Sequence, residues 1–347
     1  MILKNYLSEK EFNVAKSEYE KWQATCKRSL IFHVGTCAGL YSELNALHFA
    51  VIYCYVNNIR FELYADDANF SNSGWEDFFV PFCKLNHNPL NRKYNYRAKW
   101  YYRCWRFVFP NILLRRFYYP YLLRSQENVQ YLMQDVFFKC YSKKFVESKF
   151  TWKVFNIENQ EVQKKFTLLR SFVMRYNKQT KSEIEQIIRQ LDLPSSYCSV
   201  QIRGGDKTLE FNELIKVEEY VKELQLHMVD SNSLFVFTDD YQNVKRLKEL
   251  KPEWNIYTLT QPSECGYYND KFQSLAWEVK RKNLVKLFAI MEICFNSAFH
   301  VGCGQSCAND FIRSVKDEGT FLELKSCNEK EYGGGVKNWF KRYFLYN

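Results

Sequence analysis

The chain has 347 residues, and its hydrophobic content of 46% and charged content of 25% are those of an ordinary globular protein. This length is large for a single core, so two domains are expected. The first residues contain no apolar stretch of the kind found in signal peptides, and no apolar run in the chain is long enough to span a membrane. The sequence therefore predicts a cytoplasmic location. Neither a signal peptide nor a transmembrane segment is expected.

The 12 cysteines are scattered without regular spacing. We expect most of them to be reduced, buried residues in a cytosol-like compartment. A zinc site is not expected, because Cys303 and Cys307 form the closest pair, no second pair lies nearby and the chain has only 5 His.

The first part of the chain predicts a strand, a glycine turn, a helix and a second strand. Residues 1–27 favour an amphipathic helix, 28–34 a strand, 40–58 a helix and 59–65 a strand. This order is typical of a βαβ unit. The helix that begins after Gly39 offers its amino end to an anion. A P-loop is excluded, because no Gly-Lys-Ser/Thr follows.

A basic, aromatic segment covers residues 84–124. It contains ten Lys or Arg, no Asp or Glu, and twelve aromatic residues. The tail 336–347 has a similar composition. Three interpretations are open: a packed helical pair with outward-pointing Arg side chains, a surface for a membrane or a lipid-linked acceptor, and a nucleic-acid surface. Nucleic acid is the least favoured, because no RNA-binding signature accompanies the segment. The residues proposed for an acceptor or peripheral membrane surface are Arg97, Trp100, Arg103, Arg115 and Arg116.

The second half of the chain alternates between strands and helices. A long helix over 160–193 is predicted to end at Pro194. Beyond it we expect strands at 199–203, 233–240, 254–260 and 298–303, and helices at 217–228, 243–250, 283–297 and 306–315. Such alternation predicts a largely parallel sheet with helices on both faces.

The most informative stretch is the turn that follows the strand ending near residue 202. Gly204 and Gly205 allow a sharp turn, and Arg203, Asp206 and Lys207 lie on it. A guanidinium and an ammonium at the carboxyl end of a strand suit a diphosphate. The alternative is a surface ion pair between Asp206 and one of the two cations.

These residues resemble a known family. QIRGGDKTLEFN (201–212) is similar to the first motif of the α1,6-/α1,2-/protein O-fucosyltransferase superfamily. The strand ending in Thr-Asp-Asp (238–240) and the segment FHVGCGQSCANDFIR (299–313) resemble later motifs. In the first half, GTCAGLYSELNALHFAVIYC (35–54) and SGWEDFFVPFC (73–83) resemble the amino-terminal lobe of core α1,6-fucosyltransferases. The resemblance covers most of residues 30–315.

The resemblance implies an α/β protein of the GT-B fold, with two Rossmann-like lobes and an active site in the cleft between them. It implies an inverting fucosyltransferase that uses GDP-β-L-fucose as donor and a glycan or glycoconjugate as acceptor, with no metal and no cofactor. Alternatives are a transferase for another nucleotide sugar, and a non-catalytic glycan- or lipid-binding protein on the same fold. The expected lobes are 1–193 and 194–320, followed by a tail, 321–347, that packs back or faces a membrane.

By analogy with the family, Arg203 and Lys207 hold the β-phosphate and Asp206 anchors one of these cations. Glu210 aligns with the family's candidate base if one residue is deleted. Gln201 stands where the family has a His associated with the donor nucleotide. The other residues expected at the donor are Gly39, Asp239, Asp240, Gly304, Gln305 and Ser306.

Three of these assignments have a structural alternative or a departure from the family. Asp239 and Asp240 could instead cap the following helix. The small-residue turn 302–306 could instead serve close strand–helix packing. Glu292 lies about one turn beyond the position at which core α1,6-enzymes place an Asp against guanine.

Metal independence gives a first prediction. The adjacent pairs Asp66–Asp67 and Asp239–Asp240 would point to opposite sides of an extended chain, so neither is expected to hold a divalent ion against a diphosphate. Transfer should therefore persist in excess EDTA when measured as GDP release. Complete loss of activity that Mn²⁺ or Mg²⁺ restores would contradict this expectation.

Overall fold

The computed structural model describes residues 6–35, 39–89, 91, 129–131, 136–164, 166–210, 213–228, 231–304 and 306–325. The chain divides into two compact units. The first unit comprises residues up to 190 together with 273–292 and 310–316. The second comprises 191–272, 293–309 and the residues from 317 onward. The chain thus passes between the units several times, whereas the sequence predicts one boundary near residue 193.

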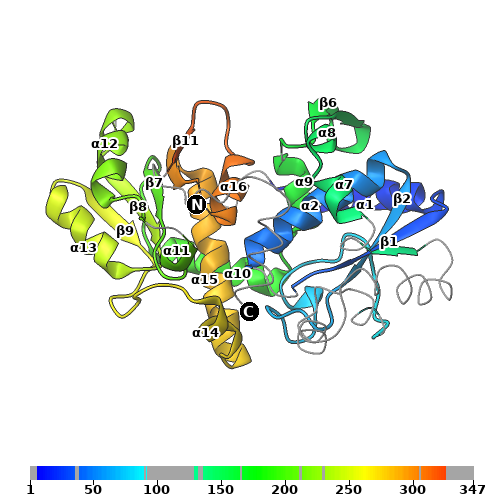
Figure 1. Cartoon of the computed structure of the whole chain (residues 1–347), viewed down its shortest axis with the longest axis horizontal. Helices are drawn as coiled ribbons and strands as arrows, with labels where there is room; N and C mark the ends of the chain where they lie inside the picture. Colours follow the sequence, from blue (N-terminus) through cyan, green and yellow to red (C-terminus); the bar gives the residue numbers. More distant parts are fainter. Residues whose placement is uncertain are drawn as a thin grey trace. The chain divides into compact units, whose positions relative to one another are not determined.

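The first unit is built on a parallel four-stranded sheet (Figure 1). Its strand order is β3-β2-β1-β4, with β1 Arg28–His33, β2 Ile59–Tyr64, β3 Lys84–Leu85 and β4 Val129–Tyr131. Helix α2 (Leu40–Val56) connects β1 to β2. The predicted βαβ unit is therefore confirmed. Every residue of β1 except the first is buried, which explains why its sequence is an apolar run and not an alternating pattern.

Aromatic side chains fill much of the core of the first unit. Helix α1 (Glu9–Ala24) begins at a capping box made by Ser8 and Glu11 and buries Tyr19. The Tyr19 ring contacts the rings of Trp22, Phe82, Trp152 and Phe172, at centroid distances between 5.5 and 6.4 Å. This packing accounts for part of the high aromatic content of the chain, because each ring buries a large apolar area.

The remaining elements before residue 191 are short, except for the 13-residue helix α10. They are η1 Trp75–Asp77, α7 Phe137–Cys140, α8 Lys143–Val146, β5 Lys149–Trp152, η4 Lys153–Phe155, β6 Ile157–Glu161, α9 Thr167–Val173 and α10 Lys178–Gln190. Strands β5 and β6 form an antiparallel pair of their own.

The prediction of one helix over 160–193 is wrong, because the segment contains the end of β6 and two separate helices. Between α9 and α10, Tyr176 forms an antiparallel bridge with Phe79. The Asn177 side chain then accepts the backbone N–H of Thr180 at 2.9 Å. An Asn that accepts from the residue three positions later is a typical helix start, so α10 begins anew after the bridge.

The second unit is built on a parallel five-stranded sheet in the order β11-β10-β7-β8-β9. Its strands are β7 Cys198–Ile202, β8 Ser233–Thr238, β9 Asn255–Thr258, β10 Phe299–Cys303 and β11 Phe321–Leu324. The four strands predicted in this half are confirmed within a few residues. Strand β11 extends the sheet beyond residue 320, the predicted end of the lobe.

Helices α12 and α13 lie against one face of this sheet (Figure 1). They pack Val221, Leu224, Val244 and Leu247 against an apolar cluster that includes Val200 and Val301. The helices of this half are α11 Lys207–Glu210, α12 Val217–His227, α13 Tyr241–Leu250, α14 Asn269–Gln273, α15 Trp277–Asn296 and α16 Cys307–Arg313. None of the described helices combines the length and the apolar character that a membrane crossing requires.

A buried ion pair lies in the first unit. The Arg170 guanidinium is 2.9 Å from Oε1 of Glu292, and the same oxygen accepts from the hydroxyls of Tyr6 at 2.7 Å and Tyr176 at 3.2 Å. Burial is the main cause that raises the pKa values of Tyr6 and Tyr176 well above their usual range, so both remain hydroxyl donors. Glu292 is 0% exposed and is engaged in this pair.

The ion pair predicts a large loss of stability when one partner is removed. Arg170→Met leaves the Glu292 carboxylate buried without its cation, which should lower the free energy of unfolding by about 3–5 kcal/mol. Urea unfolding measures the change. The control Arg246→Met removes an exposed pair with Glu218 (2.6 Å) and should have a much smaller effect. Equal effects of the two substitutions would contradict the prediction.

Candidate functional site

The turn after β7 is shaped by glycine. Gly205 has φ +51°, in the left-handed region, and a Cβ there would overlap the main chain of Tyr267. The chain reverses at Gly204 and Gly205 and enters α11 at Lys207. Arg203 is thereby held at the carboxyl edge of the sheet, where parallel α/β sheets bind ligands.

The guanidinium of Arg203 contacts two carboxylates. Nη2 donates to Oδ1 of Asp206 at 3.0 Å, and Nη1 donates to Oδ2 of Asp239 at 3.1 Å. The Arg203 side chain is 14% exposed, and its Cζ lies 5.9 Å from the centre of the Tyr267 ring. Asp206 therefore pairs with Arg203, a contact that both the family analogy and the alternative of a surface ion pair predict. A second carboxylate, Asp239, holds it as well.

Asp239, the first residue after β8, connects three separate segments. Its Oδ1 accepts the N–H of Gly204 at 2.8 Å, and its Oδ2 accepts the N–H of Tyr267 at 3.0 Å. Its main-chain oxygen accepts the N–H of Gly266 at 2.7 Å. The side chain is 10% exposed, so these hydrogen bonds form away from bulk water.

The segment 264–268 is part of this site, although it was not among the residues predicted from the sequence. The N–H of Asp206 donates to the carbonyl of Tyr267 at 2.9 Å, so the segment lies against the Arg203 turn. Gly266 has φ +110°, and a Cβ there would lie 2.7 Å from Cα of Gly205. Burial, with a smaller contribution from the Asp206 carboxylate, raises the pKa of Tyr267 to about 12. The only sequence signal for the segment is the isolated Gly266.

Asp240 has a different role from Asp239. Its side chain accepts the backbone N–H of Gln242 at 2.9 Å and caps the start of α13. Asp240 is therefore a helix cap, which was the structural alternative for the pair, whereas Asp239 contacts Arg203. Donor binding by either residue stays a prediction.

Main-chain amides at the two turns are already engaged. The N–H groups of Gly204 and Asp206 donate to Asp239 and Tyr267, and the N–H of Gly304 donates to the carbonyl of Leu324 at 3.0 Å. These three amides do not supply the anion cradle expected of small-residue turns. The guanidinium of Arg203 is a cationic group that the described contacts place at this edge.

Gln201 and Ser306 contact one another at the end of β7. Nε2 of Gln201 donates to Oγ of Ser306 at 3.0 Å. Gln201 is 0% exposed, and Ser306, just before α16, is 7% exposed. This contact brings the turn after β10 next to the strand that carries Arg203.

Several predicted site residues are elsewhere or outside the described residues. Gly39 caps the amino end of α2 in the first unit, and a Cβ there would meet open space. Glu210 ends α11, but its side chain is outside what the structure describes. The same holds for Gln305, for the acceptor-surface residues of segment 84–124 and for the tail from 326 onward.

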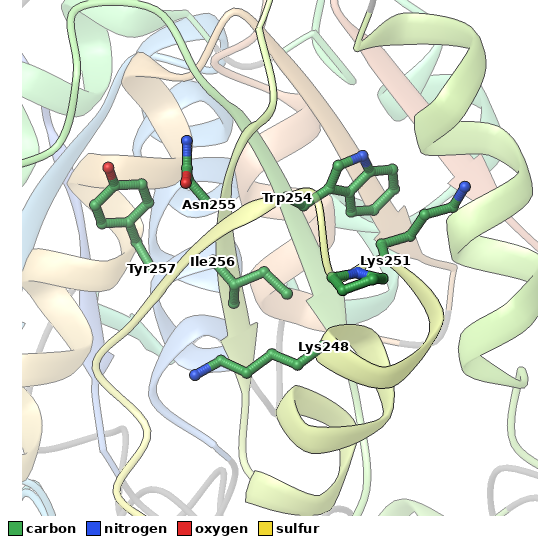
Figure 2. A pocket seen from close by; sticks show the side chains of 7 residues that line it. Lys248, Lys251, Trp254, Asn255, Ile256 and Tyr257 are labelled. Atoms are coloured by element: carbon green, nitrogen blue, oxygen red, sulfur yellow. The ribbon is translucent and has the colours of Figure 1, made fainter.

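A hollow of about 540 Å³ lies beside the edge strand β9 (Figure 2). Lys248, Lys251, Trp254 and Tyr257 are among its lining residues. Residues 255–257 pair with 233–235, the first residues of β8. The hollow therefore lies towards the amino ends of the strands, whereas Arg203 follows the carboxyl end of β7. It is not the site of Arg203.

The acidic pair in the first unit binds histidines. Asp67 is 2.6 Å from Nε2 of His33, and Asp66 is 2.9 Å from Nδ1 of His87. Within the described residues, no three His, Cys, Asp or Glu side chains gather into a group that could hold a metal ion.

Comparison with solved structures identifies the fold. The chain superposes on NodZ α-1,6-fucosyltransferase soaked with GDP-fucose, an enzyme from Bradyrhizobium, with a TM-score of 0.50 and 13% identity. The match covers 83% of this chain and 92% of NodZ. The α/β fold of the GT-B class is therefore confirmed.

Two further solved structures are similar at lower scores. A FUT1 mutant from Arabidopsis thaliana in complex with GDP has a TM-score of 0.45 and 10% identity over 90% of this chain and 74% of its own. POFUT1 in complex with GDP-fucose has a TM-score of 0.41 and 10% identity over 86% of this chain and 97% of its own. No protein-family model and no curated protein sequence matches the chain.

The contacts of Asp239 predict the effect of an isosteric change. Asp239→Asn leaves one oxygen for Gly204 but turns an NH₂ group towards the donors of Tyr267 and Arg203. The free energy of unfolding should fall by about 2–4 kcal/mol, because two hydrogen bonds to a charged group are lost. Hydrogen exchange at the amide of Tyr267 should accelerate.

Asp240→Asn is the matched control. Asn caps helices as well as Asp does, so the stability of this variant should stay close to that of the wild type. An Asp239→Asn variant as stable as Asp240→Asn, with unchanged exchange at Tyr267, would contradict the role assigned to Asp239.

Proposed function

We propose that the chain is an inverting glycosyltransferase that transfers L-fucose from GDP-β-L-fucose to a hydroxyl of a glycan or glycoconjugate. The observation that carries the proposal is the Arg203 turn. It presents a guanidinium, with Lys207 four residues later, at the carboxyl edge of a parallel sheet. The fold shared with NodZ, which was soaked with GDP-fucose, supports the choice of donor.

The proposed chemistry uses Arg203 and Lys207 at the leaving group. As the bond between the fucosyl carbon and the β-phosphate oxygen breaks, negative charge develops on GDP. Cations fixed near that oxygen stabilise the transition state more than the ground state. A phosphate oxygen would compete with Asp206, which is 27% exposed, for Nη2 of Arg203. The more buried Asp239 would keep the guanidinium in place during the exchange.

The acceptor hydroxyl would attack the anomeric carbon from the face opposite GDP, which inverts the configuration. A base removes its proton, and Glu210, one turn beyond Lys207 on α11, is the proposed group. No metal is required in this scheme, because the charge on the leaving diphosphate is met by side chains. The proposed acceptor surface is the basic, aromatic segment 84–124, together with a peripheral membrane contact.

Glu292 is engaged with Arg170, so a different residue would recognise the nucleotide base. The direct experiment is a screen of GDP-fucose, GDP-mannose and UDP-sugars for donor hydrolysis by the purified chain. Hydrolysis of GDP-fucose alone supports the proposal. Hydrolysis of another donor shifts it to a different nucleotide sugar, and glycan binding without any hydrolysis supports the non-catalytic alternative.

Arg203 gives the sharpest mutational test. Arg203→Ala should lower kcat/KM for the donor by about 30- to 1000-fold, because a charge-assisted contact to the leaving group is lost. Circular dichroism checks the fold of the variant. Arg246→Ala, an arginine exposed on α13 of the same unit, is the control and should keep full activity. Near-normal turnover of Arg203→Ala at saturating donor would refute the assignment.

A further inference from the structure

The two faces of strands β7 and β10 differ in chemistry. On one face, Val200 and Val301 join the apolar cluster beneath α12 and α13. On the other face, the alternate residues are Ser199 and Gln201 on β7 and His300 and Gly302 on β10. Ser199, Gln201 and His300 are each 0% exposed. A sheet buried on both faces usually carries apolar side chains on both, so this face needs an explanation.

Ser199 and His300 belong to a connected set of hydrogen bonds, and Gln201 contacts Ser306 separately. Oγ of Ser199 lies 2.7 Å from Nδ1 of His300 and donates to Oγ of Ser297 at 2.7 Å. Nε2 of His300 is 3.3 Å from Oδ1 of Asn309. We refer to Ser199, Gln201, Ser297, His300, Ser306 and Asn309 as the polar layer.

Gly302 allows α16 to complete this layer. A Cβ at Gly302 would overlap the side-chain amide of Asn309, so only glycine lets that amide lie against β10. Gly302, within β10, therefore serves close strand–helix packing, which was the alternative considered for residues 302–306. The same packing places Ser306, at the start of α16, beside Gln201.

In the hydrogen bond between Gln201 and Ser306, the donor and the acceptor can be identified. The amide nitrogen of Gln201 can only donate, so Oγ of Ser306 accepts, at 3.0 Å. Among the residues that the structure describes, nothing accepts the hydroxyl hydrogen of Ser306, so it can be donated to a bound ligand. Gln201 precedes Arg203 by two residues in the chain, so the contact holds Ser306 near the edge where the anion is proposed to bind.

The Gln201 side chain carries an energetic penalty that its packing does not explain. Its Oε1 is buried and has no hydrogen-bond partner among the residues that the structure describes. A buried acceptor left without a partner destabilises a fold, and an apolar side chain of similar length would avoid the cost. The presence of an amide here fits a role for its nitrogen, which donates to Ser306.

We propose that Gln201 is a positioning residue that acts through Ser306: it fixes Oγ as an acceptor and so directs the Ser306 hydroxyl hydrogen to a phosphate of the nucleotide donor. Gln201 itself is buried and does not touch the donor. The inference rests on the proposed function, because it requires a diphosphate at the Arg203 turn.

The test is calorimetric titration of the full chain with GDP. Ser306→Ala should weaken GDP binding by about 10- to 100-fold, the effect of losing a hydrogen bond to a charged group. Gln201→Met, of similar length but without a donor, should weaken it by about 5- to 20-fold, because the hydroxyl is present but no longer oriented. The double variant should bind GDP as Ser306→Ala does, since the two residues act as one unit.

Ser199→Ala is the matched control. It removes a member of the polar layer that does not contact Ser306, so it should lower the thermal midpoint and leave GDP affinity unchanged. Ser306→Thr, which keeps the hydroxyl, should restore most of the affinity. If Gln201→Met does not fold, Gln201→Asn makes the same comparison, because its shorter amide cannot reach Ser306.

The outcomes distinguish the role of Gln201 from the proposed function. Wild-type affinity in Gln201→Met, or losses that add in the double variant, would overturn the role of Gln201 while GDP binding by the wild type upholds the proposed function. No GDP binding by the wild type would overturn both. A parallel loss in Ser199→Ala would overturn the positioning role, because the polar layer would then act only through stability.

Discussion

The carboxylate of Asp239 accepts hydrogen bonds from three donors on two segments that are distant in sequence: the guanidinium of Arg203 and the N–H of Gly204 on one, and the N–H of Tyr267 on the other. An ionised carboxylate makes stronger hydrogen bonds than a neutral oxygen, and more so away from water. The direction of Arg203, the shape of the glycine turn and the position of segment 264–268 all depend on this one group. Asp239 holds the Arg203 guanidinium in place, but its carboxylate also puts a negative charge beside the candidate anion site.

The alternation of strands and helices was predictable because parallel strands are buried on both faces and read as short apolar runs between helices. The positions of β7, β8 and β10 follow from residues within each strand. The segment 160–193 shows the limit of this reasoning. The bridge between Tyr176 and Phe79 interrupts this segment, and Phe79 lies far away in the sequence. A local pattern carries no information about such a contact, so an uninterrupted helix was the natural prediction.

The contacts of the candidate site also fall into two groups: those that local sequence predicts and those that depend on distant segments. Arg203 and Asp206 are three residues apart, so their pairing was foreseeable from the turn alone. The capping of α13 by Asp240 was also a local alternative. The contribution of Tyr267 depends on how the chain returns after β9, and the polar layer depends on strand order, which places β10 beside β7. Neither can be read from a single segment, because a parallel sheet brings together strands that are distant in sequence.

The described cysteines differ sharply in accessibility. Cys26, Cys54, Cys83, Cys140, Cys198, Cys294 and Cys303 are buried, and burial raises the pKa of thiols such as Cys54 and Cys83 well above the usual range. Cys265 and Cys307 are exposed. Cys265 lies in the segment that Asp239 holds, and Cys307 directly follows Ser306. Among the described cysteines, a thiol-specific reagent would therefore meet first the two beside the Arg203 turn and the Ser306 turn. A fluorophore or spin label attached there would report on both turns, and oxidants would alter this edge of the sheet before they reached the core.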